Sequence, residues 1–597
     1  MADAVRRFAG ANVKDYGGIG GLKTVSVRNM GAAHTAVSYD GVVVSNCQAG
    51  QIDIGRFSLD NVSVLSLNIG QPEDLLQSAR MYASAGVLSI ETEKPHFENE
   101  RNSAFRVQMR GGSFGYVSPS IRWWQKAGSR TSFSLNGNYM RADGNYPFTL
   151  VNGKYVTEEK RNNSAIYTYQ IEPTLFHTFK DSSNLELKAY YFYSKRGLPG
   201  SVTLYNPISD ETLWDENVFI QTRYKKDFSQ KWSLQAQAKY NHGWNKYEDK
   251  GNEYADGLYR AVHRQDEYYL SVTALYRPWN VLSLSLAQDG IINKLRSNLP
   301  DCPFPIRYTS LTAFNARYRQ GRITATGSLV YTNVTEHVKI GDAPADFQRL
   351  APSFTVSLQP WQEQLLFLRL MYKSTFRMPT FNDLYYYRLG NRSLRPEKAN
   401  EYNMGITWSR SFSSFLNYLS VTVDGYYNDV TDKIVAFPTT YAWKMANYGK
   451  VHVTGMDATL AAAASLGKNM VLVVSGGYTW QKAIDLTDAT SKSYKDQLPY
   501  TPKHSGNVSA VLEMPWVNVG YSIVGVSERY SMSQNIPENR IDGYMEHTVS
   551  LSRNFSFRHC KLRLQAEIIN LTDTQYDVIK YYPMPGRSWR LTGTIEF

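Results

Sequence analysis

The sequence contains no run of about 18 or more apolar residues, the length that a membrane-spanning helix requires. Cysteine is scarce: Cys47, Cys302 and Cys560 lie far apart, and their odd number gives no disulfide framework. The sequence has neither a CxxC motif nor a histidine-rich spacing, so we expect no structural zinc site. The first residues, 1–7, include no apolar signal segment. The net charge of +12 is spread without basic runs, so we expect no nucleic-acid partner.

Aromatic residues are abundant by contrast. They make up 13% of the 597 residues, with 43 Tyr and 12 Trp. Aromatic girdles at the two surfaces of a membrane would explain this content, and a carbohydrate-binding surface is the alternative. A mean hydropathy of −0.42 excludes a bundle of membrane helices, but not a membrane β-barrel, because half of each barrel strand faces a polar lumen.

The end of the chain, Ser588–Phe597, alternates strictly between apolar and polar residues. Trp589, Leu591, Ile595 and Phe597 share one face of the predicted strand, and Arg590, Thr592, Thr594 and Glu596 share the other. One such strand could be the edge of a soluble sheet or the closing strand of a membrane barrel. The alternation recurs in segments of about the ~9–11 residues that cross a bilayer, at 131–139, 185–191, 232–240, 323–329 and 561–568.

Connections of two lengths separate these segments. Short turns are expected at 126–129, 181–183, 277–280, 319–321 and 466–469, and long polar loops at 142–162, 196–219, 243–266, 290–307, 374–398, 429–450, 481–500, 528–541 and 570–586. This alternation is typical of outer-membrane barrels, with short turns on the periplasmic side and long loops outside. We therefore predict an all-β membrane protein with an antiparallel transmembrane barrel of about 22 strands, whose wide lumen needs a plug.

Residues 1–100 differ in composition and are predicted to form a small α/β domain, either on the periplasmic side of the barrel or inside it. The barrel then spans residues 101–597. Short apolar runs at 25–27, 35–39, 42–44 and 62–65 predict strands, and Asp40-Gly41 predicts a hairpin turn. Pro72 followed by Glu73 and Asp74 predicts the start of a helix. Arg28 is predicted to form a salt bridge to the barrel wall.

Several motifs, in this order, resemble TonB-dependent outer-membrane receptors along nearly the whole chain. In the first domain they are 3–13, 17–20, 27–28, 40–42 and 85–92; in the barrel they are 376–385, 394–397, Glu401, 569–573, Tyr576 and 583–587. Two departures are Arg28-Asn29 for the family's Arg-Gly, and Asn68-Ile69-Gly70-Gln71-Pro72 for its Arg-Gly-Pro stretch. Asp3 already aligns inside the plug, so we expect the signal peptide, the TonB-contacting segment and the plug start to be missing here.

The resemblance implies that the first domain is a plug inside the lumen of the barrel. It also implies an energy-coupled importer in the outer membrane of a Gram-negative bacterium, not an enzyme. Its partners would be the TonB complex, the lipid bilayer and a small metal chelate, either cobalamin or an iron–siderophore complex. A haem receptor, or the barrel of an oligosaccharide importer with a surface lipoprotein lid, is the alternative. A passive porin would lack a plug, and outer-membrane proteases and lipases have smaller barrels and a catalytic cluster that is not evident here.

Ligand-binding residues are expected where two plug tips meet the long loops: Ala32, Ala33, His34, Asn46, Gln48, Tyr385, Tyr387 and Arg388. The stretch 31–34 with 40–42 is similar to the plug of cobalamin transporters. His34 could instead bind haem iron, or serve only as a hydrogen-bonding residue. The tyrosines could stack on a ring system or belong to the aromatic girdle. We expect no cofactor beyond a possible structural calcium held by Glu248, Asp249 and Asp256, in what could equally be a solvated loop.

Overall fold

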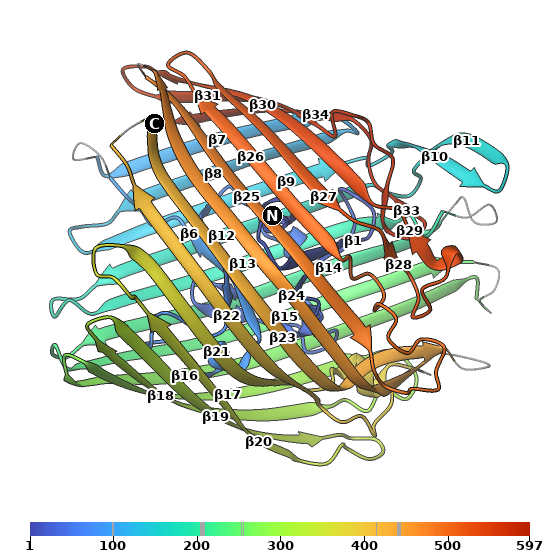
Figure 1. Ribbon diagram of the computed structural model, residues 1–597. Helices are drawn as coiled ribbons and strands as arrows, with labels where there is room; N and C mark the ends of the chain where they lie inside the picture. Colours follow the sequence, from blue (N-terminus) through green and yellow to red (C-terminus); the bar gives the residue numbers. More distant parts are fainter. Residues whose placement is uncertain are drawn as a thin grey trace.

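The protein is described from a computed structural model (Figure 1). It describes residues 1–97, 101–202, 209–251, 254, 256–387, 389–413, 415–438, 443–467 and 469–597. The expected domain boundary near residue 100 adjoins residues 98–100, which lie outside the described residues; the first barrel strand begins at Ser103.

In the described part of the chain, 22 antiparallel strands close into one barrel. Each strand pairs with its neighbour in sequence, and β34 closes the ring by pairing with β7, with Thr594 opposite Gln108. Closure leaves no unpaired strand edge, a requirement for a sheet surrounded by lipid. The barrel strands are β7 (Ser103–Gly112), β8 (Tyr116–Lys126), β9 (Thr131–Ala142), β12 (Ile166–Thr178), β13 (Asn184–Leu198), β14 (Glu211–Asp227), β15 (Trp232–Lys250), β16 (Leu258–Trp279), β17 (Leu282–Ser297), β18 (Ile306–Gln320), β19 (Ile323–His337), β20 (Phe347–Leu358), β21 (Leu365–Arg377), β22 (Glu397–Ser411), β23 (Leu416–Pro438), β24 (Trp443–Gly467), β25 (Met470–Asp485), β26 (His504–Glu513), β27 (Asn518–Val526), β30 (Tyr544–Ser556), β31 (Lys561–Ile569) and β34 (Ser588–Glu596).

The two faces of the strands are those predicted from the alternation. Trp589, Leu591 and Phe597 expose 52%, 55% and 51% of their surface on the outside of the barrel. Thr592 and Thr594, between them in sequence, line the interior. The outer face is therefore apolar, as a surface in contact with acyl chains must be.

The connections sort by length between the two ends of the barrel. Short turns such as 127–130, 280–281 and 321–322 lie at one end, here called the turn end, and most of the long connections lie at the other, the loop end. The expected loop 243–266 is wrong in extent, because β15 runs to Lys250 and β16 starts at Leu258. The loop end also carries β10 (Pro147–Asn152), β11 (Tyr155–Lys160), α3 (Phe381–Tyr385), β28 (Arg529–Tyr530), η3 (Pro537–Asn539), β29 (Arg540–Ile541), β32 (Asp577–Ile579) and β33 (Tyr582–Pro583).

The N-terminal domain lies inside the bore (Figure 1). Its four-stranded sheet has the order β4-β3-β6-β5, and β1 and β2 form a separate hairpin. Asp40 and Gly41 both have positive φ, 49° and 80°, in the predicted hairpin turn between β3 and β4. Its elements are α1 (Ala2–Val5), β1 (Ala11–Asp15), β2 (Lys23–Val27), η1 (Ala32–His34), β3 (Thr35–Tyr39), β4 (Val42–Val44), η2 (Ile54–Arg56), β5 (Val62–Ile69), α2 (Ala79–Ala83) and β6 (Gly86–Thr92).

The predicted helix start at Pro72 is wrong. The Asp74 carboxylate accepts a hydrogen bond from the Leu76 amide at 2.9 Å, which holds this stretch in a bend. Leu75 and Leu76 are buried there against Leu275 of the barrel wall. The helix α2 begins only at Ala79, so contact with the wall overrides the local helix signal.

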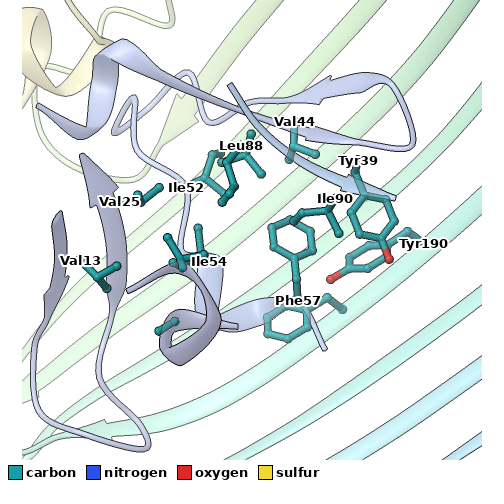
Figure 2. Close-up of a cluster of buried hydrophobic side chains, with 14 of the residues drawn as sticks. Val13, Val25, Tyr39, Val44, Ile52, Ile54, Phe57, Leu88, Ile90 and Tyr190 are labelled. Carbon is teal, nitrogen blue, oxygen red and sulfur yellow. The ribbon is translucent and has the colours of Figure 1, made fainter. Parts of the chain in front are cut away.

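The core of the N-terminal domain includes side chains of the barrel wall. Figure 2 shows Tyr190, from β13, among residues of the domain such as Tyr39 and Phe57. The rings of Tyr190 and Phe219 stack with centroids 4.6 Å apart, and Phe57 and Tyr39 complete this aromatic cluster. The domain therefore buries part of its apolar surface against the wall.

Ion pairs complete the contact between the domain and the wall. The predicted salt bridge of Arg28 is confirmed: its Nε lies 3.0 Å from Oδ2 of Asp457 on β24. On the other side, Lys188 of β13 donates to Asp40 at 2.6 Å. Lys373 of β21 donates to the carbonyls of Gly70 and Ser84 at 2.7 and 2.6 Å. Polar contacts of this kind follow from a lumen-facing row of polar side chains on every strand.

The helices in the described ranges are short, and none of them has the length and apolar character needed to cross a membrane.

The lipid-facing row of β34 can be tested by substitution. We expect Leu591→Arg to lower the free energy of unfolding by about 2–4 kcal/mol, because it places a charge among acyl chains near the middle of a strand. Thr592→Arg, one residue along on the interior face, is the matched control and should cost much less. Urea unfolding in phospholipid vesicles measures both; equal costs would mean that the faces are wrongly assigned.

Candidate ligand-binding site

Two segments of the N-terminal domain meet at the loop end, and we call residues 30–34 the first tip and 45–50 the second tip. They are neighbours, because a Cβ built on Gly50 would lie 3.8 Å from Cβ of Ala33. Gly50 has a φ of +68°, and a side chain there would collide with Cγ2 of Thr380. The second tip is therefore pressed against the loop that carries α3, and only glycine fits at this contact.

The helix α3 holds the backbone of the second tip. The amides of Phe381 and Asn382, in its first turn, donate to the carbonyls of Cys47 and Gln48 at 3.1 and 2.9 Å. Thr380 and Asp383 form a capping box at the same end of the helix. The first-turn amides of α3 that are normally left free are thus used to bind the domain.

His34 of the first tip is buried rather than exposed. Its Nε2–H donates to Oε2 of Glu397 at 2.6 Å, and burial lowers the pKa of the imidazole, so that it is neutral near neutral pH. Oε1 of Glu397 accepts from Arg377 at 3.1 Å and from the Ile434 amide at 2.7 Å. We call these four residues the His34–Glu397 network.

The network reaches α3 and β23. Arg377 donates through Nη1 to Asp383 of α3 at 2.8 Å. Lys433 of β23 donates to the carbonyl of Met30, in the first tip, at 3.0 Å. Both tips of the domain are therefore bound to the same loop and the adjoining strands, so a displacement of α3 would act on both.

Some of the remaining predicted residues of the tips already form hydrogen bonds within the protein. The Asn46 side chain accepts from the Ala49 amide at 3.0 Å and so shapes the turn. Gln48 is buried and accepts from Asn245 at 2.8 Å. Cys47, between them, donates to Gln265 at 3.2 Å, and burial raises the pKa of its thiol. Ala32 and Ala33 are half-buried.

The predicted tyrosines lie at the end of α3 and just after it. Tyr385 of α3 is half-buried, donates to Glu336 of β19 and lies under the guanidinium of Arg392, 5.6 Å from the ring centre. Tyr387 is also half-buried. Arg388 lies outside the described residues. Tyr385 thus joins α3 to the wall, and its ring packs beside the Arg392 guanidinium and the Phe381 ring.

Two of the three proposed calcium ligands already accept hydrogen bonds from other side chains of the protein. Glu248 accepts from Lys246 at 3.2 Å and from Arg260 at 2.8 Å, and Asp249 accepts from Tyr254 at 2.7 Å. Asp256 is exposed. Nowhere in the described ranges do three or more His, Cys, Asp or Glu side chains gather so as to hold a metal ion. Calcium binding stays a prediction without a ligand cluster to support it.

Sequence reasoning did not find the wall residues that hold the tips. Arg377, Asp383 and Glu397 belong to the motifs that carry the resemblance, but the motifs do not predict the contact of Glu397 with His34, and Lys433 lies in none of them. The available signal was a charged residue at an interior-facing strand position. That signal is shared by many residues, and it does not say which partner each one meets.

The barrel is closed, a separate domain fills its bore, and the long loops lie at one end. This is the architecture of a plugged receptor of the outer membrane. Residues 97–571 match the family described as "TonB dependent receptor-like, beta-barrel", which is more than half of the chain. The chain belongs to this family of TonB-dependent receptors and transporters, and is located in the outer membrane of a Gram-negative bacterium.

Solved structures share the fold at low sequence identity. The copper transporter OprC superposes with a TM-score of 0.79 at 16% identity, over 100% of this chain and 95% of that one. The FrpB iron transporter of Neisseria meningitidis (F3-3 variant) gives 0.78 at 15%, over 100% and 96%. The siderophore receptor PiuA of Acinetobacter baumannii gives 0.75 at 15%, over 100% and 94%.

The His34–Glu397 network predicts a strong dependence on Glu397. We expect Glu397→Ala to destabilise the fold by about 3–5 kcal/mol, because it leaves the buried Arg377 without one of its two carboxylates and the Ile434 amide without an acceptor. The rate of amide hydrogen exchange at residues 30–34 should also rise, because the first tip loses its contact with the wall.

The matched control for Glu397→Ala is Glu528→Ala, which removes the half-exposed pair with Arg540 and should cost about 0–1 kcal/mol. Urea unfolding of the full chain compares the two. If both variants lost the same small amount, the network would not hold the tip.

Proposed function

We propose that this protein imports a scarce metal chelate, cobalamin or an iron–siderophore complex, into the periplasm. The TonB complex would supply the energy by acting on the N-terminal domain, and no enzymatic step is involved. The single observation that carries the proposal is that α3, the two tips and the wall form one connected set of buried contacts at the loop end. A ligand that binds there would be coupled directly to the domain that blocks the bore.

The ligand would first meet the half-buried small residues of the first tip and two tyrosines, Tyr385 at the end of α3 and Tyr387 just after it. Ala32 and Ala33 present little side chain, so a large ring system could approach the backbone. Tyr385 offers an aromatic face for stacking. Contact with Tyr385 would move α3, whose amides hold Cys47 and Gln48, and would thereby loosen the second tip.

A chamber of 920 Å³ lies beside the N-terminal domain, and the first residues of the given chain, Met1 to Ala4, form part of its lining. It lies between residues of the domain such as Arg6 and the wall strands on both sides of the β34–β7 closure. It extends from Pro585, near the loop end, to Arg563 and Thr594, near the turn end. Eight lysine and arginine side chains and five carboxylates line it, so an anionic chelate would be favoured.

The haem alternative has no support from His34. Nε2 of this residue, which would have to bind iron, already donates to Glu397 in a buried position. The structures of similar fold bear names that refer to copper, iron and siderophores, and those ligands belong to those proteins. They support the class of cargo proposed here.

Transport assays on cells test the proposal. Cells that carry the full-length gene, with the signal peptide and the TonB-contacting segment, should bind radiolabelled cobalamin or an iron–siderophore complex whether or not TonB is present, but should accumulate it only when TonB is present. The same cells without the protein give the background. Accumulation that continued unchanged in a strain lacking TonB would falsify energy coupling, and the absence of binding to a panel of chelates would remove the cargo class.

An engineered disulfide between the second tip and Thr380, the N-cap of α3, tests whether ligand binding can occur without transport. A Cβ at Gly50 would lie 3.6 Å from Cβ of Thr380, within the range for a disulfide. We expect the variant Gly50→Cys with Thr380→Cys, in a Cys47→Ser background, to bind ligand but to transport at least about tenfold more slowly when oxidised, because the tip cannot leave α3.

Reduction of the same protein should restore transport, and each single cysteine variant should be insensitive to oxidant. These comparisons remove the effect of strain at Gly50, whose φ of +68° disfavours a side chain. Full transport by the oxidised double variant would show that the second tip need not move.

A further inference from the structure

A groove of 780 Å³ crosses the lipid-facing side of the barrel between β13 and β19. Gly290 of β17 lines the groove, and its partners in register are Leu270 on β16 and Ser310 on β18. A Cβ built on Gly290 would meet nothing within 4 Å, so the missing side chain leaves open space. Tyr268 and Tyr308 border the groove toward the loop end.

Positive charge lies directly above this groove on the same outer face. Arg264 of β16 stands opposite Arg296 of β17, and Asp266 stands opposite Lys294. Like charges directly opposite each other in a sheet are destabilising unless a counter-charge is present. The two arginines and the lysine have one carboxylate among them, so this corner of the surface carries an excess of positive charge.

Asp266 is already shared by other donors. It accepts from Arg296 at 3.0 Å, from Nδ1 of His242 at 2.8 Å and from the Tyr240 hydroxyl at 2.9 Å. Arg264 is exposed, and in the described ranges neither it nor Lys294 has an ion pair within 4.0 Å. The ammonium of Lys294 lies 5.4 Å from the centre of the Tyr268 ring. Two cations therefore remain for an anion from outside the chain.

The spacing fits a lipid. Lys294 lies four residues along β17 from Gly290, which is about 13 Å on an extended strand. The tyrosines between them mark the level at which aromatic rings sit between headgroups and acyl chains. Because the loop end faces outside, the cations lie at the headgroups of the outer leaflet and the groove lies among its acyl chains.

We propose that this face binds one phosphorylated lipid of the outer leaflet. Its phosphate would be held between Arg264 and Lys294, and an acyl chain would lie over Gly290 beneath Tyr268 and Tyr308. Phosphate suits this position because it would supply the counter-charge that the Arg264–Arg296 pair lacks. The site is separate from the bore and does not depend on which chelate is transported.

Native mass spectrometry of the full chain tests this proposal. The protein is placed in nanodiscs of phosphatidylcholine that contain, as the probe, lipid A or the same lipid after removal of its phosphates. We expect the wild-type protein to retain the phosphorylated form at least about tenfold better, since each cation near a membrane surface adds to anion affinity. Arg264→Gln with Lys294→Gln should abolish this preference.

Gly290→Leu fills the groove and should weaken retention of both forms of the lipid. Gly593→Leu is its matched control, since Gly593 belongs to the lipid-facing row of β34, away from the groove. Equal retention of the two lipids by the wild-type protein, or no effect of either set of variants, would overturn the proposal. A second barrel retained in place of a lipid would overturn it as well, by assigning the face to self-association.

Discussion

The pairing of β34 with β7 is the constraint on which the rest of this structure depends. In lipid, every backbone amide and carbonyl must find a partner within the protein, and a sheet achieves this only when it closes on itself. With the 22 strands of the described chain, closure creates a bore too wide for side chains to fill. The bore therefore receives a folded domain, and the contacts between domain and wall decide how the protein can work.

Those contacts combine apolar packing with buried charge. The aromatic cluster of Tyr39, Phe57, Tyr190 and Phe219 gives the domain a fixed position against β13 and β14. The ion pairs of Arg28 with Asp457 and Lys188 with Asp40 give it a fixed orientation. Buried pairs contribute modest net stability but are costly to break singly, because one charge then remains without its partner. Such an interface is specific, because each buried charge has one particular partner on the wall.

The inner and outer faces of the same strands perform different tasks. On β16, the interior residue Gln265 accepts a hydrogen bond from Cys47 of the second tip, while its neighbour Asp266 lies on the outer face with Arg296 and His242. Alternation along a strand allows both, because successive side chains point to opposite faces. A binding function at the loop end and a lipid contact outside it can therefore be encoded within the same few residues of one strand.

The sequence by itself determined the barrel, the lipid-facing rows and the hairpin at Asp40-Gly41, because these follow from local periodicity and from backbone preference. The place of the first domain in the bore was expected only from its resemblance to the plug of a known family. The sequence also indicated that Arg28 would meet the wall. Only the tertiary structure decided that His34 is buried against Glu397, that Pro72 starts no helix, and that Glu248 is paired with Arg260 rather than left free for calcium. These outcomes depend on which strand lies opposite which segment of the domain. That placement brings together residues more than 300 positions apart, such as His34 and Glu397, and no local pattern specifies it.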